Sequence, residues 1–161
     1  MNERGMKKHM LAAVSLGVAI LIGGVLPRTA VAQVGANADI LNPNLASADQ
    51  LMALPHLNAA TAEAIEDGRP WLTMGALDAA LAEHLSAEQQ SELYAKLFLP
   101  LNLNEAGDAE IKLIPGVGDR MAHEFEEYRP YVNLAQFRRE IGKYVDDDEV
   151  ARMERYVTIS N

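Results

Sequence analysis

Residues 113–122 read Leu-Ile-Pro-Gly-Val-Gly-Asp-Arg-Met-Ala and stand between two stretches whose apolar residues recur at intervals of three and four. That spacing places apolar side chains on one face of a helix, so the segment predicts two short helices joined by a tight turn. Gly116 and Gly118 permit the positive φ angles that such a turn needs, and Val117 between them is expected to enter the core. Ala122 is small enough for two helices to cross closely.

The predicted turn also carries a chemical possibility. Amides in the first turn of a helix have no intrahelical partner, and the helix dipole favours an anion beside them. The amides of Gly116, Val117 and Gly118 are therefore a candidate anion site, with Arg120 as the nearest basic side chain. A Gly-x-Gly turn can also simply connect two packed helices, so an architectural role stays open.

The sequence around this turn repeats at an offset of 60 residues without a gap. Apolar positions keep their class over the whole unit, which indicates a tandem duplication into residues 41–100 and 101–161. In the first copy His56 and Asn58 replace the two glycines, so the amides of that turn are expected to be less free. The aligned pairs include Leu41-Asn42-x-Asn44-x-Ala46 with Leu101-Asn102-x-Asn104-x-Ala106, and Arg69-Pro70-Trp71 with Arg129-Pro130-Tyr131.

Capping residues divide each copy into four short helices. Ser47 to Gln50 and Ser86 to Gln89 fit the capping box, in which two side chains hold free amides at a helix start. Gly107 replaces Ser47 in the second copy and predicts a weaker cap. No alternating stretch of useful length competes, so an all-α fold without a sheet is expected. The predicted helices are 48–54, 59–67, 74–84, 87–97, 108–114, 119–128, 134–144 and 147–156.

The N-terminus reads as a signal peptide. Lys7 and Lys8 precede an uncharged apolar run from Met10 to Leu26, and Ala30-Val31-Ala32 is a pattern that signal peptidase accepts. The run has 17 residues, whereas a membrane span needs about 20, so cleavage after Ala32 is favoured over an uncleaved anchor. We expect a periplasmic or secreted protein with a flexible mature N-terminus at residues 33–40.

Net charge limits the kinds of partner that the protein can bind, and cysteine content limits its covalent and metal chemistry. Removing residues 1–32 leaves 10 basic and 22 acidic side chains, a formal charge of −12 for the predicted mature chain. A field of that sign repels polyanions and membrane headgroups and favours basic partners. Cysteine is absent, so disulfides and thiolate metal sites are excluded, and a helical core has to supply the stability.

Other chemistry finds little support. His56, His84 and His123 match no zinc spacing, and the acidic run 146–149 lacks the alternating ligands and the glycine of an EF-hand loop. The sequence contains no readable nucleophile and base, no Walker phosphate loop and no dinucleotide fingerprint. We therefore predict a non-enzymatic binding protein with no catalytic residue, metal, cofactor or small-molecule substrate. Oligomeric state is left open.

Two further residue pairs repeat between the copies. Trp71 and Tyr131 follow Arg-Pro and are expected to cover the core where a helix ends, with a recognition surface as the alternative. Arg69 and Arg129 are expected to cap the last carbonyls of their own helices. The single concentrated basic spot is Arg138, Arg139 and Lys143, so any nucleic acid is expected between it and Gly116.

The second copy resembles the helix-hairpin-helix family, specifically the ComEA-like competence proteins of bacterial envelopes. The resemblance rests on Leu101-Asn102-x-Asn104, on Leu113-x-Pro115-Gly116-Val117-Gly118-x-x-x-Ala122 and on Arg129. It recurs in weakened form from Leu41 to Arg69 and covers nearly the whole mature chain. It implies hairpin amides that grip nucleic-acid phosphates without reading sequence, through Gly116, Val117 and Gly118 with Arg120 nearby. Exported members take up transforming DNA.

Two functions are therefore expected as alternatives. The first is weak, sequence-independent DNA binding through the second hairpin. The second is a protein-interaction or scaffold role in the cell envelope, in which acidic faces meet a basic or membrane-bound partner. Nonspecific duplex binding draws its free energy from Lys and Arg displacing counterions, and four acidic residues near the hairpin oppose that term. These residues are Asp119, Glu124, Glu126 and Glu127.

Overall fold

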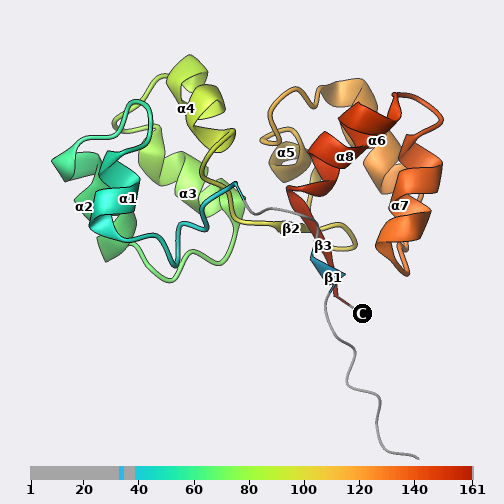
Figure 1. Ribbon diagram of the computed structural model, residues 1–161, viewed down its shortest axis with the longest axis horizontal. Coiled ribbons are helices and arrows are strands. Elements are labelled where there is room, and N and C mark those ends of the chain that lie inside the picture. Colours follow the sequence, from blue (N-terminus) through green and yellow to red (C-terminus); the bar gives the residue numbers. More distant parts are fainter. Residues whose placement is uncertain (1–32, 35–38, 161) are drawn as a thin grey trace, which may run out of the picture.

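The computed structural model describes residues 33–34 and 39–160, and the predicted signal peptide lies outside the described residues. This part of the chain is mostly helical, with eight helices and three very short strands. Figure 1 shows the helices in two groups of four, α1–α4 from residues 41–100 (the first half) and α5–α8 from residues 101–160 (the second half). None of the described helices combines the length and the apolar character needed to cross a membrane.

All eight helices begin at the predicted residue, and all but α2 end one to three residues early. The early ends arise because the last turns tighten, as where the His84 amide bonds the Leu81 carbonyl three residues back. Except at the end of α1 and α5, equivalent helices keep the offset of 60. The helices are α1 (Ala48–Met52), α2 (Ala59–Asp67), α3 (Met74–Leu81), α4 (Ala87–Tyr94), α5 (Asp108–Ile111), α6 (Asp119–Glu127), α7 (Leu134–Ile141) and α8 (Asp147–Glu154).

The prediction that the protein has no sheet is wrong. Strand β2 (Leu101–Asn102) pairs in parallel with β3 (Val157–Ile159), and β1 (Gln33–Val34) pairs antiparallel with β3 on its other side. In the first half Leu41 and Leu97 form a single parallel bridge at the equivalent positions. Pairs of two or three residues are too short to produce the alternating pattern by which a strand is recognised. They close each half by joining its first residues to its last.

Four residues of the segment 33–40, namely Gln33, Val34, Asp39 and Ile40, are described, and they contact the rest of the chain. Gln33–Val34 supplies strand β1, which lies against the end of the second half, as Figure 1 shows. Asp39 lies 3.5 Å from the Arg155 guanidinium, and Ile40 is buried. These contacts form because β3 offers an open backbone edge and Ile40 brings an apolar side chain. Gln33, Val34 and Asp39 therefore contact the second half before the chain enters the first.

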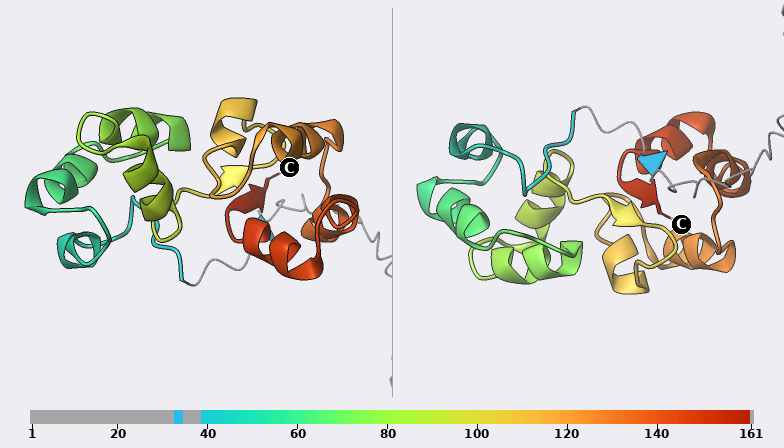
Figure 2. Two further views of the ribbon diagram at one scale, coloured as in Figure 1. Left: turned by 90° about the horizontal axis from the view of Figure 1, so that it is seen from above. Right: turned by 90° about the horizontal axis from the view of Figure 1, so that it is seen from below.

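The buried apolar side chains form one continuous cluster that includes residues of both halves. Phe98, at the end of the first half, meets the ring of Tyr156 edge to face, with ring centres 5.0 Å apart. In the second half the rings of Phe125 and Phe137 pack in the same way at 5.2 Å. Figure 2 shows the two groups of helices side by side, with the segment that leads into β2 crossing between them.

A side-chain clamp explains the repeated Leu-Asn-x-Asn motif. The Asn104 side chain accepts a hydrogen bond from the Tyr131 amide at 2.7 Å and donates one to the Tyr131 carbonyl at 2.9 Å. Asn44 makes the same pair of bonds with Trp71 at the same two distances. Each asparagine thus holds the segment after the second helix of its half against the start of that half.

The residues around this clamp have structural roles. Tyr131 is fully buried and Trp71 packs against the core, which confirms the prediction that these aromatics cover it. The prediction that Arg69 and Arg129 cap their own helices is wrong. Arg69 donates to the carbonyls of Pro43 and Ala46, and Arg129 donates to the equivalent carbonyl of Ala106, because the clamp brings those free carbonyls within reach.

The helix α5 has no side-chain cap, and the residue that would complete a capping box there joins the two halves instead. The capping boxes of Ser47 and Ser86 are confirmed, and Gly107 makes no side-chain cap. In the first half the Gln50 side chain reaches back to the Ser47 amide at 2.9 Å. Its counterpart Glu110 instead crosses to the first half and accepts a hydrogen bond from the Gly75 amide at 3.0 Å. A carboxylate at the start of α3 is favoured by the helix dipole.

Replacing Asn104 with alanine tests the clamp. The variant leaves both backbone groups of buried Tyr131 without partners, so we expect the free energy of unfolding to fall by about 2 kcal/mol or more. Urea denaturation followed by circular dichroism measures this loss, and Asn44→Ala should behave similarly. Glu63→Gln, at an exposed position of α2, is the control. A loss no larger than that of the control would contradict the role of the clamp.

Replacing Glu110 with alanine tests the junction. Without the carboxylate the Gly75 amide loses its acceptor, so its hydrogen exchange, measured by NMR, should become faster. Gln50→Ala is the matched control, since it opens the capping box of α1 and leaves the junction bond in place. Equal protection of the Gly75 amide in the two variants would show that Glu110 does not join the halves.

Candidate nucleic-acid interface

The hairpin between α5 and α6 has the turn that the sequence predicts. Gly116 adopts a positive φ of 81°, and the Val117 amide bonds the Ile114 carbonyl at 3.0 Å while its side chain is buried. Gly118 has an extended backbone, so only one of the two glycines is required by its backbone angle. In the first half His56 takes the equivalent left-handed position with a φ of 66°. Both hairpins therefore share one backbone path.

The two hairpins differ in how the following helix is capped. In the first half the Asn58 side chain accepts hydrogen bonds from the amides of Ala60 and Thr61, at 3.0 and 3.1 Å. At the equivalent place Gly118 has no side chain, and α6 begins without a side-chain cap. The amides of Arg120 and Met121 thus lack the acceptor that Asn58 supplies in α2. The first turn of α6 remains open to an external acceptor.

A hollow of about 470 Å³ lies in front of this helix start. Its walls come from Gly118–Met121 and from the turn between α7 and α8, at Tyr144 and Val145. The Arg120 guanidinium lies 6.0 Å from the centre of the Tyr144 ring. The Tyr144 hydroxyl is fixed in turn by a hydrogen bond of 2.7 Å with the hydroxyl of Tyr128. The hollow thus combines an uncapped helix start, one guanidinium and an aromatic wall.

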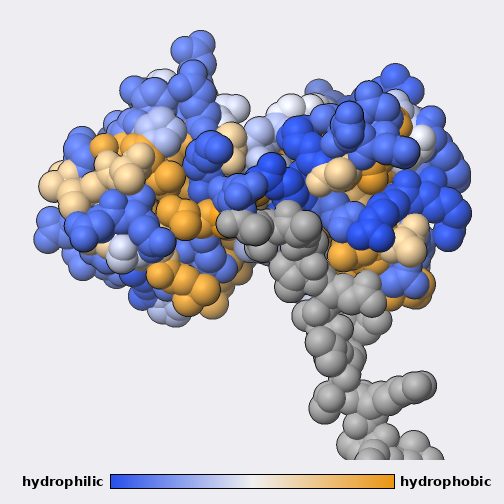
Figure 3. All heavy atoms as spheres, viewed as in Figure 1, coloured by the Kyte–Doolittle hydropathy of each residue, from blue (hydrophilic) through white to orange (hydrophobic). Residues whose placement is uncertain are grey.

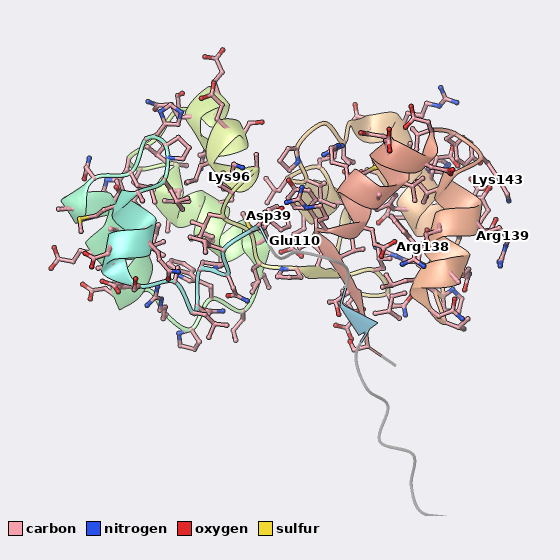
Figure 4. The ribbon with its side chains drawn as sticks, in the orientation of Figure 1. Asp39, Lys96, Glu110, Arg138, Arg139 and Lys143 are labelled. Carbon is pink, nitrogen blue, oxygen red and sulfur yellow. The ribbon has the colours of Figure 1, made fainter. Side chains whose placement is uncertain are left out.

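The predicted basic cluster is only partly brought together. Figure 4 shows Arg139 and Lys143 at the outer edge of the second half and Arg138 nearer its middle. Arg138 forms a two-bond pair with the Glu154 carboxylate, at 2.5 and 2.6 Å. Arg139 and Lys143 both bond to Glu140, and the bond from Lys143, followed by that from Arg139, lowers the pKa of Glu140. All three predicted cations are therefore paired with carboxylates.

Sequence reasoning missed the cation that contacts the hairpin. Arg152 of α8 donates a hydrogen bond to the Pro115 carbonyl, and its Nη2 would lie 3.0 Å from a Cβ atom added to Gly116. The same guanidinium pairs with Glu149 at 2.6 Å. In the first half the equivalent contact is between the Glu92 carboxylate and the His56 ring, at 2.7 Å. The sole sequence signal for Arg152 was its alignment with Glu92, 60 positions earlier.

The acidic residues expected to repel a duplex differ in burial and in partners: one is buried with a carboxylate oxygen that has no hydrogen-bond partner among the described residues, and two lie near a basic side chain. Glu124 is buried, Glu126 lies 3.5 Å from Arg129, and Glu127 lies 3.8 Å from His123. Asp119 is the most exposed of the four, with 92% of its side chain accessible. The ammonium of Lys112 lies 3.0 Å from its carboxylate. Lys112, which also pairs with Asp108, is a second cation near the hairpin that the sequence analysis did not single out.

Among the residues that the structure describes, no group of three or more histidine, aspartate or glutamate side chains is arranged to hold a metal ion. Comparison of the chain with protein-family models, with curated proteins and with solved structures found no match.

Replacing Arg152 with glutamine tests its role at the hairpin. The variant removes the guanidinium from the Pro115 carbonyl, so we expect the hairpin to open more readily and the Val117 amide to exchange faster. A loss of about 1–2 kcal/mol in unfolding free energy is expected. Arg139→Gln removes a guanidinium that does not contact the hairpin and is the control. Unchanged exchange of the Val117 amide in the Arg152 variant would contradict the assignment.

Proposed function

We propose that the two halves are tandem helix-hairpin-helix units, and that the second binds the phosphate backbone of DNA weakly and without sequence preference. The observation that carries the proposal is the difference between the hairpins. Asn58 occupies the first amides of α2, whereas Gly118 leaves the equivalent amides of α6 uncapped. The phosphate-binding unit is then the second hairpin, while the first keeps the turn without the open helix start.

The chemistry of this site fits phosphate. Backbone amides at a helix start donate hydrogen bonds toward an anion, and the helix dipole adds a favourable field. Contacts to phosphate position a protein on nucleic acid but carry no sequence information, so binding through amides is nonspecific. Arg120 lines the hollow, and Arg152 supports the turn through its hydrogen bond to the Pro115 carbonyl. These groups suit one or two phosphates of a single backbone strand.

The charge of the chain limits the affinity. Arg138, Arg139 and Lys143 are paired with Glu140 and Glu154, so few cations are free to displace counterions. With one or two phosphates neutralised, the salt slope should be shallow, between about −1 and −2. Weak binding with little dependence on salt is therefore the expected behaviour.

The proposed setting follows from the N-terminal sequence. A signal peptide at residues 1–32 would export the chain to the periplasm or beyond, where the resemblance to ComEA-like proteins points to DNA uptake. The role is one of binding and not of catalysis. The alternative is an interaction module for a basic envelope protein, and the exposed leucines of the first half, Leu45 and Leu72, favour it.

Substituting Gly118 with asparagine tests the proposal by copying the cap of the first half. Gly118 has an extended backbone and open space where a Cβ atom would stand, so the variant should fold normally. The new side chain is expected to occupy the amides of Arg120 and Met121 and to reduce DNA affinity at least tenfold. Fluorescence anisotropy with labelled single-stranded and duplex DNA, at about 50 and 200 mM salt, measures the change.

The control places the same side chain at a different helix. Gly107 also has an extended backbone with open space, and Gly107→Asn adds a cap to α5, whose start does not line the hollow. This variant should bind DNA like the unmodified protein. Absence of any DNA binding by the unmodified protein, or equal binding by the Gly118 variant, would reject the proposed function.

A further inference from the structure

Among the described residues, the two most exposed large apolar side chains lie in the first half, and Val132 of the second half is exposed to a lesser degree. Leu72 is 83% exposed and Leu45 is 81% exposed. Each directly follows a residue of the clamp, Trp71 or Asn44, so both lie at the same end of the first half. Figure 3 shows hydrophobic atoms gathered at the lower edge of this half. At the position equivalent to Leu45 the second half carries Glu105.

Leu72 also stands at the edge of a hollow between the halves. This hollow has a volume of about 260 Å³, and its floor includes the apolar residues Met74, Leu99 and Leu101. Its remaining wall carries the carboxylates of Glu105 and Glu110, and no basic side chain lines it. An isolated exposed leucine is ordinary at a protein surface, whereas Leu72 beside this hollow extends its apolar lining into a contiguous apolar surface.

We propose that this surface docks a segment of a partner protein that presents a large apolar side chain next to lysine or arginine. The surface consists of Leu45, Leu72, Leu99, Glu105 and Glu110, and we call it the Leu72 surface. The apolar side chain would fill the hollow and cover Leu72, and the basic group would face Glu105 and Glu110. Removal of leucine surface from water favours the complex, and the charges favour the orientation.

The negative charge of the protein favours a basic partner segment over a second copy of the chain and over an anionic membrane. The full chain has a formal charge of −9, so a second copy would bring like charge to an acidic rim. A membrane rich in anionic headgroups is disfavoured for the same reason. The Leu72 surface contains no residue of the hairpin at 116–118, so the inference does not depend on phosphate binding by the second half.

The test is a selection of random 12-residue peptides displayed on phage against the full-length protein. Recovered peptides should be enriched in a large apolar residue adjacent to lysine or arginine. Leu72→Glu should weaken their binding at least tenfold, as measured by fluorescence anisotropy with synthetic labelled peptides. Val132→Glu is the matched control, because Val132 is the equivalent residue of the second half and is also exposed, at 59%. It should leave binding unchanged.

Reversing the charge of Glu105 distinguishes electrostatic complementarity from nonspecific apolar binding. The Glu105 side chain is exposed, so Glu105→Lys should leave the fold unchanged, which circular dichroism can verify. This variant should bind the selected basic peptides at least threefold more weakly than the unmodified protein. It should also bind better to versions of those peptides in which lysine and arginine are replaced by glutamate.

Three results would overturn the inference. Recovery of no binding peptides is one, and enrichment of peptides without basic residues is another. The third is peptide binding that Leu72→Glu does not weaken. Sedimentation analysis adds a separate outcome. If the unmodified protein self-associates and Leu72→Glu abolishes this, the occupant is a second copy and the proposed partner is wrong.

Discussion

The clamp between an asparagine side chain and the backbone after the second helix is the constraint on which each half depends. An asparagine amide offers one acceptor and two donors, so Asn104 can satisfy both the amide and the carbonyl of Tyr131. The asparagine side chain makes the same pair of backbone hydrogen bonds that a neighbouring β-strand would make. It fixes where α6 ends relative to β2, and it brings the Ala106 carbonyl within reach of Arg129. The position of the hairpin at the other end of α6 follows from this arrangement.

A shared backbone supports different chemistry in the two halves. At the hairpin, position 56 is histidine and position 116 is glycine, yet both have positive φ. The residue that contacts the turn from the fourth helix changes from Glu92 to Arg152. The cap changes from an asparagine to none, and the freed Glu110 joins the halves. Because the clamp holds the backbone in each half, these positions can vary without altering the path of the chain.

Sequence reasoning succeeded where the determining interaction is local. The helix starts were predictable because capping residues such as Ser47 and Ser86 lie within three residues of the amides they bind. It failed where the partner is remote in sequence. The strands join residues more than 50 positions apart, and Arg152 meets Pro115 across 37 positions. The spacing of apolar residues along the sequence carries no information on such long-range contacts, so they are seen only in the three-dimensional structure.

The basic cluster illustrates the same limit at the candidate site. Arg138, Arg139 and Lys143 suggest a phosphate contact when cations alone are counted, but Glu154 pairs with Arg138 from 16 residues away. Once these charges are paired, an acidic chain retains an attraction for phosphate only where neutral donors are aligned. Backbone amides and a helix dipole act within about one helical turn, whereas the repulsion of a net charge is screened over about 8 Å at physiological salt. A short-range attraction and a screened repulsion can coexist at one surface, and the uncapped start of α6 is where we propose that the former acts.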